Sequence, residues 1–195
     1  VNKSRGRNRV IEVLLMSYDP VIRQYLNAIN GITIEFCNAE DFVVSLKKEG
    51  ITLEVINCEK PTIRVRRSNR VYFTYRGIPQ MNELWPFLNA LVRVSNNVVH
   101  LDEKEMEMAK VIRGNVKLFV TPDCTKCPLA AELLYQLPIV NDNVDLEVID
   151  VNDYPDLAKK FRVMSVPKIV LNDKAEIPGS FPPHILLKMM AKSSS

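Results

Sequence analysis

The segment whose residue types and spacing are best suited to chemistry is Cys124-Thr125-Lys126-Cys127. The apolar run Val116–Thr121 predicts a short strand before it, and an amphipathic helix is predicted to begin at Cys124. Unpaired N–H groups and the helix dipole at such a start stabilise an anion, and Lys126 adds a positive charge. We therefore expect Cys124 to ionise readily and attack a disulfide, and Cys127, on the same turn, to resolve the mixed disulfide.

Two other roles for Cys124 and Cys127 are zinc binding and an inert place in the core. Zinc sites of this kind need a second cysteine pair at matching spacing. The remaining cysteines, Cys37 and Cys58, are widely separated, and neither belongs to a C-x-x-C. Redox chemistry is therefore favoured, and we predict neither a metal nor a cofactor.

A second chemical feature is the pair Val166-Pro167, which precedes the predicted strand Pro167–Leu171. A proline at this place is suited to a cis peptide bond beside the cysteines. The backbone polar groups of Val166 would then be free to pair with an extended substrate. We expect Thr125, Lys126, Val166 and Pro167 to contact the substrate.

The second half of the chain alternates strand and helix signals, which predicts a small α/β sandwich with a mixed sheet. The helix after the cysteines is expected to bury one leucine face. That face comprises Leu129, Leu133, Leu134 and Leu137. The remaining predicted elements are a strand over Val144–Val151, a helix from Pro155 to Phe161, a brief strand to Ile177 and a last helix from Pro183 to Lys192.

The first half shows the same order of elements, which indicates an internal duplication. Val13 and Pro61 precede Leu118 and Pro167 by nearly the same offset, so Pro61 is predicted to be cis like Pro167. On this alignment the counterpart of the C-x-x-C is Ser17–Ile22, which contains no cysteine. The predicted elements are a strand over Val10–Met16, a helix from Asp19 to Gly31, a strand over Ile32–Cys37, a helix from Asn38 to Gly50, a hairpin of Pro61–Arg67 and Val71–Arg76, and a helix capped by Asn82. A connector from Asn96 to Gly114 holds a short helix capped by Asp102.

These features together resemble the thioredoxin superfamily, in particular the two-unit, glutaredoxin-like protein disulfide oxidoreductases of thermophilic archaea and bacteria. The segments that carry the resemblance are Phe119–Pro122, Cys127–Ala130, Val163–Val170, Arg76–Pro79 and Phe87-Leu88. The resemblance implies two tandem thioredoxin-like α/β units, each a mixed sheet flanked by helices. Residues 1–98 would form a degenerate unit without a C-x-x-C, and residues 99–195 a unit with the redox pair.

The resemblance also implies a thiol–disulfide oxidoreductase that acts on protein substrates and receives electrons from a reductase or another donor. It fits cytosolic disulfides, which hyperthermophiles tolerate. Thr125-Lys126 departs from the proline and aromatic residue that the family tends to have between its cysteines. The rival function is a binding or adaptor module in which the dithiol serves as a structural bond or sensor. A glutathione-using glutaredoxin is disfavoured because the segment after Gly179 lacks a Gly-Asp anion-binding pattern.

Composition excludes other classes of function. The chain has 195 residues with a net charge of +3, which is too small to indicate nucleic-acid binding. No apolar run approaches the roughly 20 residues of a membrane span, and no secretory signal is recognised, so a cytoplasmic location is expected. The arginines at positions 64, 66, 67 and 70 are interpreted as charges that prevent an exposed edge strand from pairing with another sheet.

The remaining cysteines, Cys37 and Cys58, allow several interpretations. A disulfide or a second redox pair is geometrically conceivable, because both residues are predicted near the edge that carries the active site in such folds. Two small, buried, unpaired side chains are the favoured interpretation.

Overall fold

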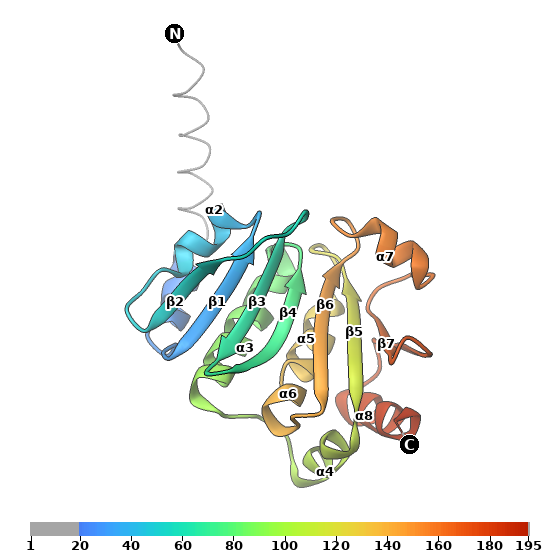
Figure 1. The fold of residues 1–195 in the computed structure, drawn as a ribbon. Coiled ribbons are helices and arrows are strands. Elements are labelled where there is room, and N and C mark those ends of the chain that lie inside the picture. The colour runs from blue at the N-terminus through green and yellow to red at the C-terminus, as the bar shows by residue number, and fades with distance from the viewer. Residues whose placement is uncertain (1–19, 195) are drawn as a thin grey trace.

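The computed structural model describes residues 20–194 and contains one mixed sheet of eight strands (Figure 1). The strand order is β2-β1-β3-β4-β6-β5-β7-β8. The strands are β1 (Ile32–Cys37), β2 (Ile51–Val55), β3 (Thr62–Arg67), β4 (Arg70–Arg76), β5 (Gly114–Val120), β6 (Val144–Asp150), β7 (Lys168–Leu171) and β8 (Ala175–Pro178).

The two halves of the sheet have the same pairing pattern. In the first unit β1 is parallel to β2 and antiparallel to β3, which continues into β4. In the second unit β5 is parallel to β6 and antiparallel to β7, which continues into β8. The predicted pair of mixed α/β units is therefore confirmed. Parallel pairing of β4 with β6 joins them into one sheet.

The helices lie on both faces of this sheet. A helix covers residues 20–26. The other helical elements are α2 (Glu40–Val43), η1 (Val44–Leu46), η2 (Met81–Glu83), α3 (Leu84–Asn96), α4 (Glu103–Val111), α5 (Cys127–Leu134), α6 (Leu137–Val140), α7 (Pro155–Lys160) and α8 (Pro183–Ser193). Among these described helices, none is both long enough and apolar enough to cross a membrane.

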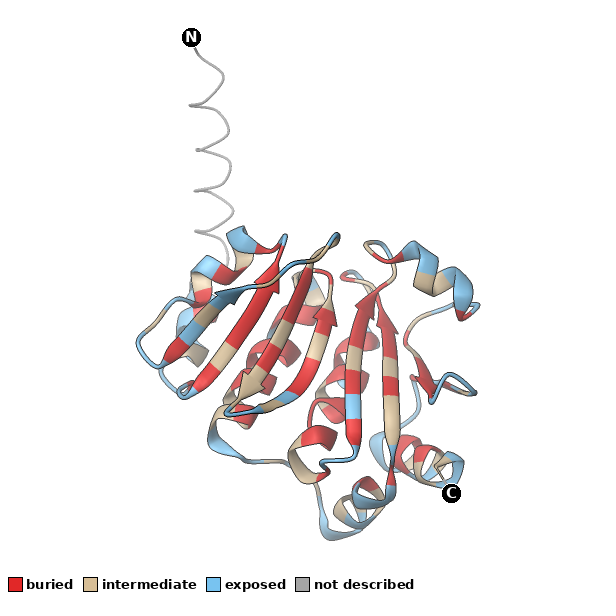
Figure 2. Ribbon diagram, viewed as in Figure 1, coloured by how far each residue is buried: buried red, intermediate tan, exposed pale blue. Residues whose placement is uncertain are grey.

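One hydrophobic core runs through both units beneath α3 and α5 (Figures 1 and 2). The ring of Phe73 on β4 contacts Phe87 on α3 edge-on, with a centroid distance of 5.8 Å. It also contacts Tyr135 of the second unit at 4.6 Å. Aromatic side chains carry large buried areas, so this cluster joins the two units tightly.

A smaller cluster lies under α7. It is formed by Phe119, Ile149, Tyr154, Phe161 and Val170. Phe119 and Ile149 point away from the main core because side chains alternate between the two faces of a strand.

The helix predicted from Asn38 to Gly50 is present but shorter. Helical structure ends at Leu46. Strand β2, from Ile51, was not predicted, and it is defined by its parallel pairing with β1. Asn38 does not cap α2. Its backbone is left-handed, with φ of 52°, and its side-chain amide donates to the Cys58 carbonyl at 3.5 Å. The predicted strand Val10–Met16 lies outside the described residues.

The predicted alignment of the two units is wrong. By its pairing, β1 takes the place that β5 holds in the second unit. Residues 20–22, which the prediction aligned with the C-x-x-C, belong to the helix before β1. Cys37 pairs with Thr62, just after Pro61, as Phe119 pairs with Lys168, just after Pro167. Cys37 therefore corresponds to Phe119, and the helical segment after β1, the counterpart of the C-x-x-C, still contains no cysteine.

The arginine-rich hairpin is not an exposed edge. Its strands β3 and β4 lie inside the sheet, between β1 and β6. Arg64 and Arg66 both bind the carboxylate of Glu35 on β1, and Arg70 pairs with Asp142 at 2.9 Å. These charges pair across neighbouring strands, where opposite charges stabilise a sheet.

The connector helix α4 begins as predicted. Asp102 accepts a hydrogen bond from the Glu105 amide at 2.8 Å, and the Glu105 side chain accepts one from the Asp102 amide at 3.0 Å. This reciprocal capping satisfies two amide groups at the helix start. A division of the chain between residues 98 and 99 remains a prediction.

Replacing Arg93 is expected to destabilise the contact between the units. Arg93 on α3 donates to Glu132 on α5 with an Nη2–Oε1 distance of 2.5 Å, and both side chains are largely buried. Arg93→Met leaves the Glu132 carboxylate buried without its cation, which costs about 3 kcal/mol. Guanidinium unfolding of the oxidised protein measures this loss.

The matched control is the double variant Arg93→Met/Glu132→Leu, in which no charge is left unpaired. It is expected to recover most of the lost free energy of unfolding. A single variant as stable as the parent would show that the ion pair does not stabilise the contact between α3 and α5.

Candidate functional site

The two cysteines of the C-x-x-C form a disulfide where β5 leads into α5. Their Cα atoms are 5.5 Å apart, and the amide of Cys127 donates to the Cys124 sulfur at 3.1 Å. The helix begins at Cys127 rather than at Cys124 as predicted. Cys127 is fully buried and Cys124 is half-buried. Of the two sulfurs, Cys124 is therefore the one that an incoming reactant can reach.

The Val166–Pro167 peptide bond is cis, whereas the predicted cis bond before Pro61 is not present, although both prolines lie in the described part of the chain. Pro167 is buried and Val166 is half-buried. Gly179 packs against this proline so closely that a Cβ atom on it would lie 2.8 Å from the Pro167 Cβ. The segment after β8 is thereby held next to the proline loop.

Thr125 and Lys126 are both exposed, in the turn that precedes α5. Lys126 lines a cavity of about 910 Å³ that also contacts Gly179, the neighbour of Pro167. Of the four predicted contact residues, Lys126 lines this cavity, whereas Thr125, Val166 and Pro167 do not.

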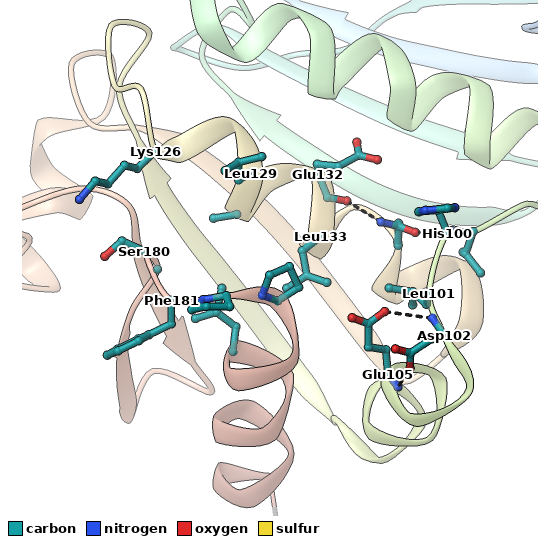
Figure 3. Close-up of a pocket in the computed structure, with 17 residues that line it drawn as sticks. His100, Leu101, Asp102, Glu105, Lys126, Leu129, Glu132, Leu133, Ser180 and Phe181 are labelled. Atoms are coloured by element: carbon teal, nitrogen blue, oxygen red, sulfur yellow. Dashed lines mark hydrogen bonds between the residues drawn. The ribbon is translucent and has the colours of Figure 1, made fainter.

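Figure 3 shows how this cavity extends from Lys126 along α5 towards α4. Its near part is apolar, with Leu129 from α5 and Phe181 from the segment after β8. Its far part contains His100, Asp102 and Glu105. Leu129 was predicted to face the core, but it is 67% exposed and lines this cavity instead.

The first unit also reaches the dithiol. The backbone amide of Asn82 donates to the Pro122 carbonyl at 3.0 Å, and its side-chain amide donates to the Cys124 carbonyl at 3.3 Å. Asn82 therefore holds the segment before the disulfide and does not act as the helix cap that the sequence predicted. On either side of it, Met81 and Trp85 are exposed by 58% and 37%.

Two buried carboxyl groups lie near this segment. Glu83, next to Asn82, is fully buried, and within the described residues neither of its carboxylate oxygens has a hydrogen-bond partner. Burial, with the nearby charge of Asp150, raises the pKa of Glu83 from 4.5 to about 8. Burial also raises the pKa of Asp150, at the end of β6, to about 6. Both groups can take up or release protons at the pH values where thiols ionise.

Sequence reasoning missed Met81, Asn82, Glu83 and Trp85 as part of the site. All four come from the first unit, and the signal that could have found them is a carboxylate within an otherwise apolar helix start. The pairing of β4 with β6 brings this segment next to Pro122 and Cys124. Among residues 20–194, no group of three or more His, Cys, Asp or Glu side chains is placed to hold a metal ion.

The other two cysteines also form a disulfide, with 6.0 Å between the Cα atoms of Cys37 and Cys58. The favoured interpretation of two buried, unpaired thiols is therefore wrong. Cys37 ends β1 and is buried, but Cys58 lies in the loop before β3 and is only half-buried.

Comparison with known protein families identifies both units. Residues 18–97 match a family described as a thioredoxin-like domain, and residues 114–190 match one described as a thioredoxin domain. A thioredoxin of Methanocaldococcus jannaschii is 31% identical over 86 residues, which cover 44% of this chain and 98% of that protein. An NADH dehydrogenase of Bacillus subtilis is 27% identical over 104 residues, but this chain spans only 20% of its length.

Two solved structures cover almost the whole described fold. The crystal structure of a Sulfolobus solfataricus protein is 57% identical, with a TM-score of 0.78, and the match covers 83% of this chain and 99% of that one. A protein disulfide oxidoreductase from Aeropyrum pernix is 19% identical, with a TM-score of 0.74, and the match covers 91% and 92%. The second match shows a common fold.

Removing the buried carboxyl group of Glu83 is expected to change how stability depends on pH. The unfolded chain loses the Glu83 proton above pH 4.5, whereas the folded chain keeps it until about pH 8. The folded state therefore binds more protons in this window, and the free energy of unfolding falls as the pH rises through it. Glu83→Gln removes this loss, so the variant should gain on the order of 3 kcal/mol relative to the parent between pH 5 and pH 8.

Guanidinium unfolding at the two pH values measures this difference. Glu107→Gln, an exposed position on α4, is the control and should show no such gain. Equal pH dependence in Glu83→Gln and the parent would show that Glu83 is already ionised in the folded protein.

Proposed function

Because the chain belongs to the thioredoxin superfamily, we propose that it is a thiol–disulfide oxidoreductase that acts on polypeptide substrates through Cys124 and Cys127. The observation that carries this proposal is the disulfide at the start of α5, in which one sulfur is accessible and the other is buried. That asymmetry separates an attacking thiol from a resolving thiol.

In the reducing direction, the Cys124 thiolate attacks one sulfur of the substrate disulfide and releases the other as a thiolate. Cys127 then loses its proton and attacks the Cys124 sulfur, which releases the second substrate thiolate and closes the Cys124–Cys127 disulfide. Two electrons and two protons pass to the substrate. A dithiol donor restores the reduced pair, and the reverse sequence oxidises substrate dithiols.

The proposed contacts with the substrate are made by Thr125, Lys126, Val166 and Pro167. The exposed turn carries Thr125 and Lys126, and the half-buried Val166 offers backbone groups to an extended chain. The apolar part of the cavity beside Lys126 is suited to the side chains that flank the substrate cysteine. We expect the exchange partners to be protein substrates and a reductase in the cytosol.

Glu83 and Asp150 support the proton transfers of this cycle. Oxidation of a dithiol releases two protons, and the pKa values of these carboxyl groups, about 8 and about 6, make them suitable acceptors near neutral pH. Glu83 follows Asn82, whose side chain donates to the Cys124 carbonyl. Asp150 precedes Val151, whose amide donates to the carbonyl of Val120 at the end of β5.

The first unit serves as a platform for the substrate in this proposal. Met81 and Trp85 are exposed on either side of Asn82, whose side chain binds the Cys124 carbonyl, so a polypeptide bound at Cys124 can extend over them. Exposed aromatic and thioether side chains of this kind are typical of contact surfaces for polypeptides.

Replacing either cysteine tests the chemistry. Cys124→Ser should lower the rate of dithiol-dependent reduction of a protein disulfide at least about tenfold, because the attacking sulfur is lost. Cys127→Ser should retain attack but accumulate a mixed disulfide with the substrate, because the resolving sulfur is lost. Turnover assays and non-reducing electrophoresis measure the two effects.

Circular dichroism of both variants confirms that they remain folded. An undiminished rate in Cys124→Ser would contradict the proposed nucleophile. If the parent protein is oxidised once but never turns over a disulfide substrate with a reductant, the adaptor or sensor function is correct instead.

Truncating Trp85 tests the platform. Trp85→Ala should raise KM for a protein disulfide by roughly five- to thirty-fold, which corresponds to the 1–2 kcal/mol lost when a central interface aromatic is truncated. The rate with a small disulfide such as glutathione disulfide should stay the same, because such a substrate does not reach Trp85.

The control is Val98→Ala, an exposed apolar residue beyond the other end of α3. It should leave KM for both substrates unchanged. A Trp85→Ala variant with the parent KM for protein substrates would exclude this part of α3 from the docking surface.

A further inference from the structure

The Cys37–Cys58 disulfide lies at the same edge of the sheet as the redox pair, where β1 and its counterpart β5 end. Cys37 is the last residue of β1, the counterpart of β5, and the C-x-x-C begins four residues after β5 ends. Cys58 lies in the loop that ends at Pro61, just before β3, and β3 is the counterpart of β7, which follows Pro167. The disulfide therefore joins the end of the central strand of the first unit to the loop that corresponds to the proline loop of the second.

The two sulfurs of this pair also differ in accessibility. Cys37 is 4% exposed, whereas Cys58 is half-buried in an irregular loop. The C-x-x-C shows the same division between a half-buried Cys124 and a buried Cys127. An incoming thiolate can reach Cys58, and the covered Cys37 would then be the leaving sulfur.

The surrounding chain holds both residues in place independently of the S–S bond. Cys37 is paired with Thr62 in the sheet, and the Ile56 amide donates to the Phe36 carbonyl at 2.8 Å. The Pro61 carbonyl accepts hydrogen bonds from the Gly77 amide at 2.9 Å and from the Tyr154 hydroxyl at 3.0 Å.

The loop is also tied to the second unit. Besides its bond to Pro61, the Tyr154 hydroxyl lies 2.8 Å from the Thr62 hydroxyl, and Lys60 pairs with Asp156 at 3.6 Å. After reduction the two thiols would therefore stay close together, as a reversible pair requires.

We propose that Cys37 and Cys58 form a second thiol–disulfide exchange centre, in which Cys58 is the sulfur that external dithiols attack. A thiolate of the external dithiol bonds to Cys58, and Cys37 leaves as a thiolate and takes up a proton. The second thiol of the donor loses its proton and attacks its own mixed-disulfide sulfur, which frees Cys58 to be protonated. The donor is oxidised to a disulfide, and the pair gains two electrons and two protons.

This centre works independently of the C-x-x-C. Cys37 ends β1 and Cys124 follows β5, and four strand spacings separate β1 from β5 in the sheet. At about 4.8 Å per spacing the two centres lie roughly 19 Å apart, which is too far for direct sulfur–sulfur exchange. Each centre therefore exchanges with external thiols at the same edge of the sheet.

The test uses the full chain with Cys124→Ser/Cys127→Ser, which leaves Cys37 and Cys58 as its only cysteines. The folded protein is equilibrated in buffers with graded ratios of reduced to oxidised dithiothreitol, quenched with acid and alkylated. Mass spectrometry then counts the free thiols, and circular dichroism follows the fold. The expected result is a single reversible two-electron transition in which both thiols appear together while the protein stays folded.

Two further variants in this background test the role of Cys58. With Cys37→Ser, the remaining Cys58 should react with the aromatic disulfide 5,5′-dithiobis(2-nitrobenzoate) about tenfold faster than Cys37 does in the Cys58→Ser variant. Equal rates or the reverse order would overturn the assignment of Cys58 as the attacked sulfur.

A pair that stays oxidised in excess reduced dithiothreitol until the protein is denatured would overturn the proposal and leave a structural disulfide. Since the C-x-x-C is absent from these variants, the outcome does not depend on the proposed function of Cys124 and Cys127. Failure of that function would show only in the turnover assay of the parent protein.

Discussion

The parallel pairing of β4 with β6 is the interaction on which the rest of the structure depends. It places the last strand of the first unit next to an edge strand of the second, so eight strands form one sheet. Strands β1, β4, β6 and β5 consequently end at the same edge of the sheet, at Cys37, Arg76, Asp150 and Val120. Segments that are far apart in the chain meet at this edge because parallel strands have their carboxyl ends on the same side.

The contacts between the units are consequences of this pairing. Helix α3 packs beside α5, where Arg93 binds the buried Glu132. The start of the same helical region brings Asn82 to the Cys124 carbonyl and Glu83 close to Asp150. In the loop after β6, Tyr154 of the second unit donates to the Pro61 carbonyl and so fixes the loop that contains Cys58 and Pro61. The first unit thus contributes to the surroundings of the redox pair although it has no C-x-x-C.

The two disulfides show two ways of placing cysteines on one topology. In the second unit both sulfurs belong to the turn at the start of α5, so three positions separate them. In the first unit one sulfur comes from the end of β1 and the other from the loop before β3, and 21 positions separate them. Both arrangements leave one sulfur accessible and one covered, because one cysteine of each pair packs against the core and the other remains in a loop or turn at the surface.

Local patterns in the sequence determined the fold class, most elements of the second unit, the capped connector helix and the redox pair. These features depend on neighbours in the chain: the apolar run before Cys124, the spacing to Cys127, and Asp102 with Glu105. The alignment of the first unit was mistaken because β1 and β2 are defined by which strands pair, and pairing is not a local property.

Only the tertiary structure decided that Cys37 lies next to Cys58, that the arginine-rich hairpin lies inside the sheet, and that Glu83 is buried beside the dithiol segment. Each of these depends on contacts between residues far apart in the chain. Such contacts are set by how the strands assemble and by which side chains lose water when they do, and no short segment of sequence contains that information.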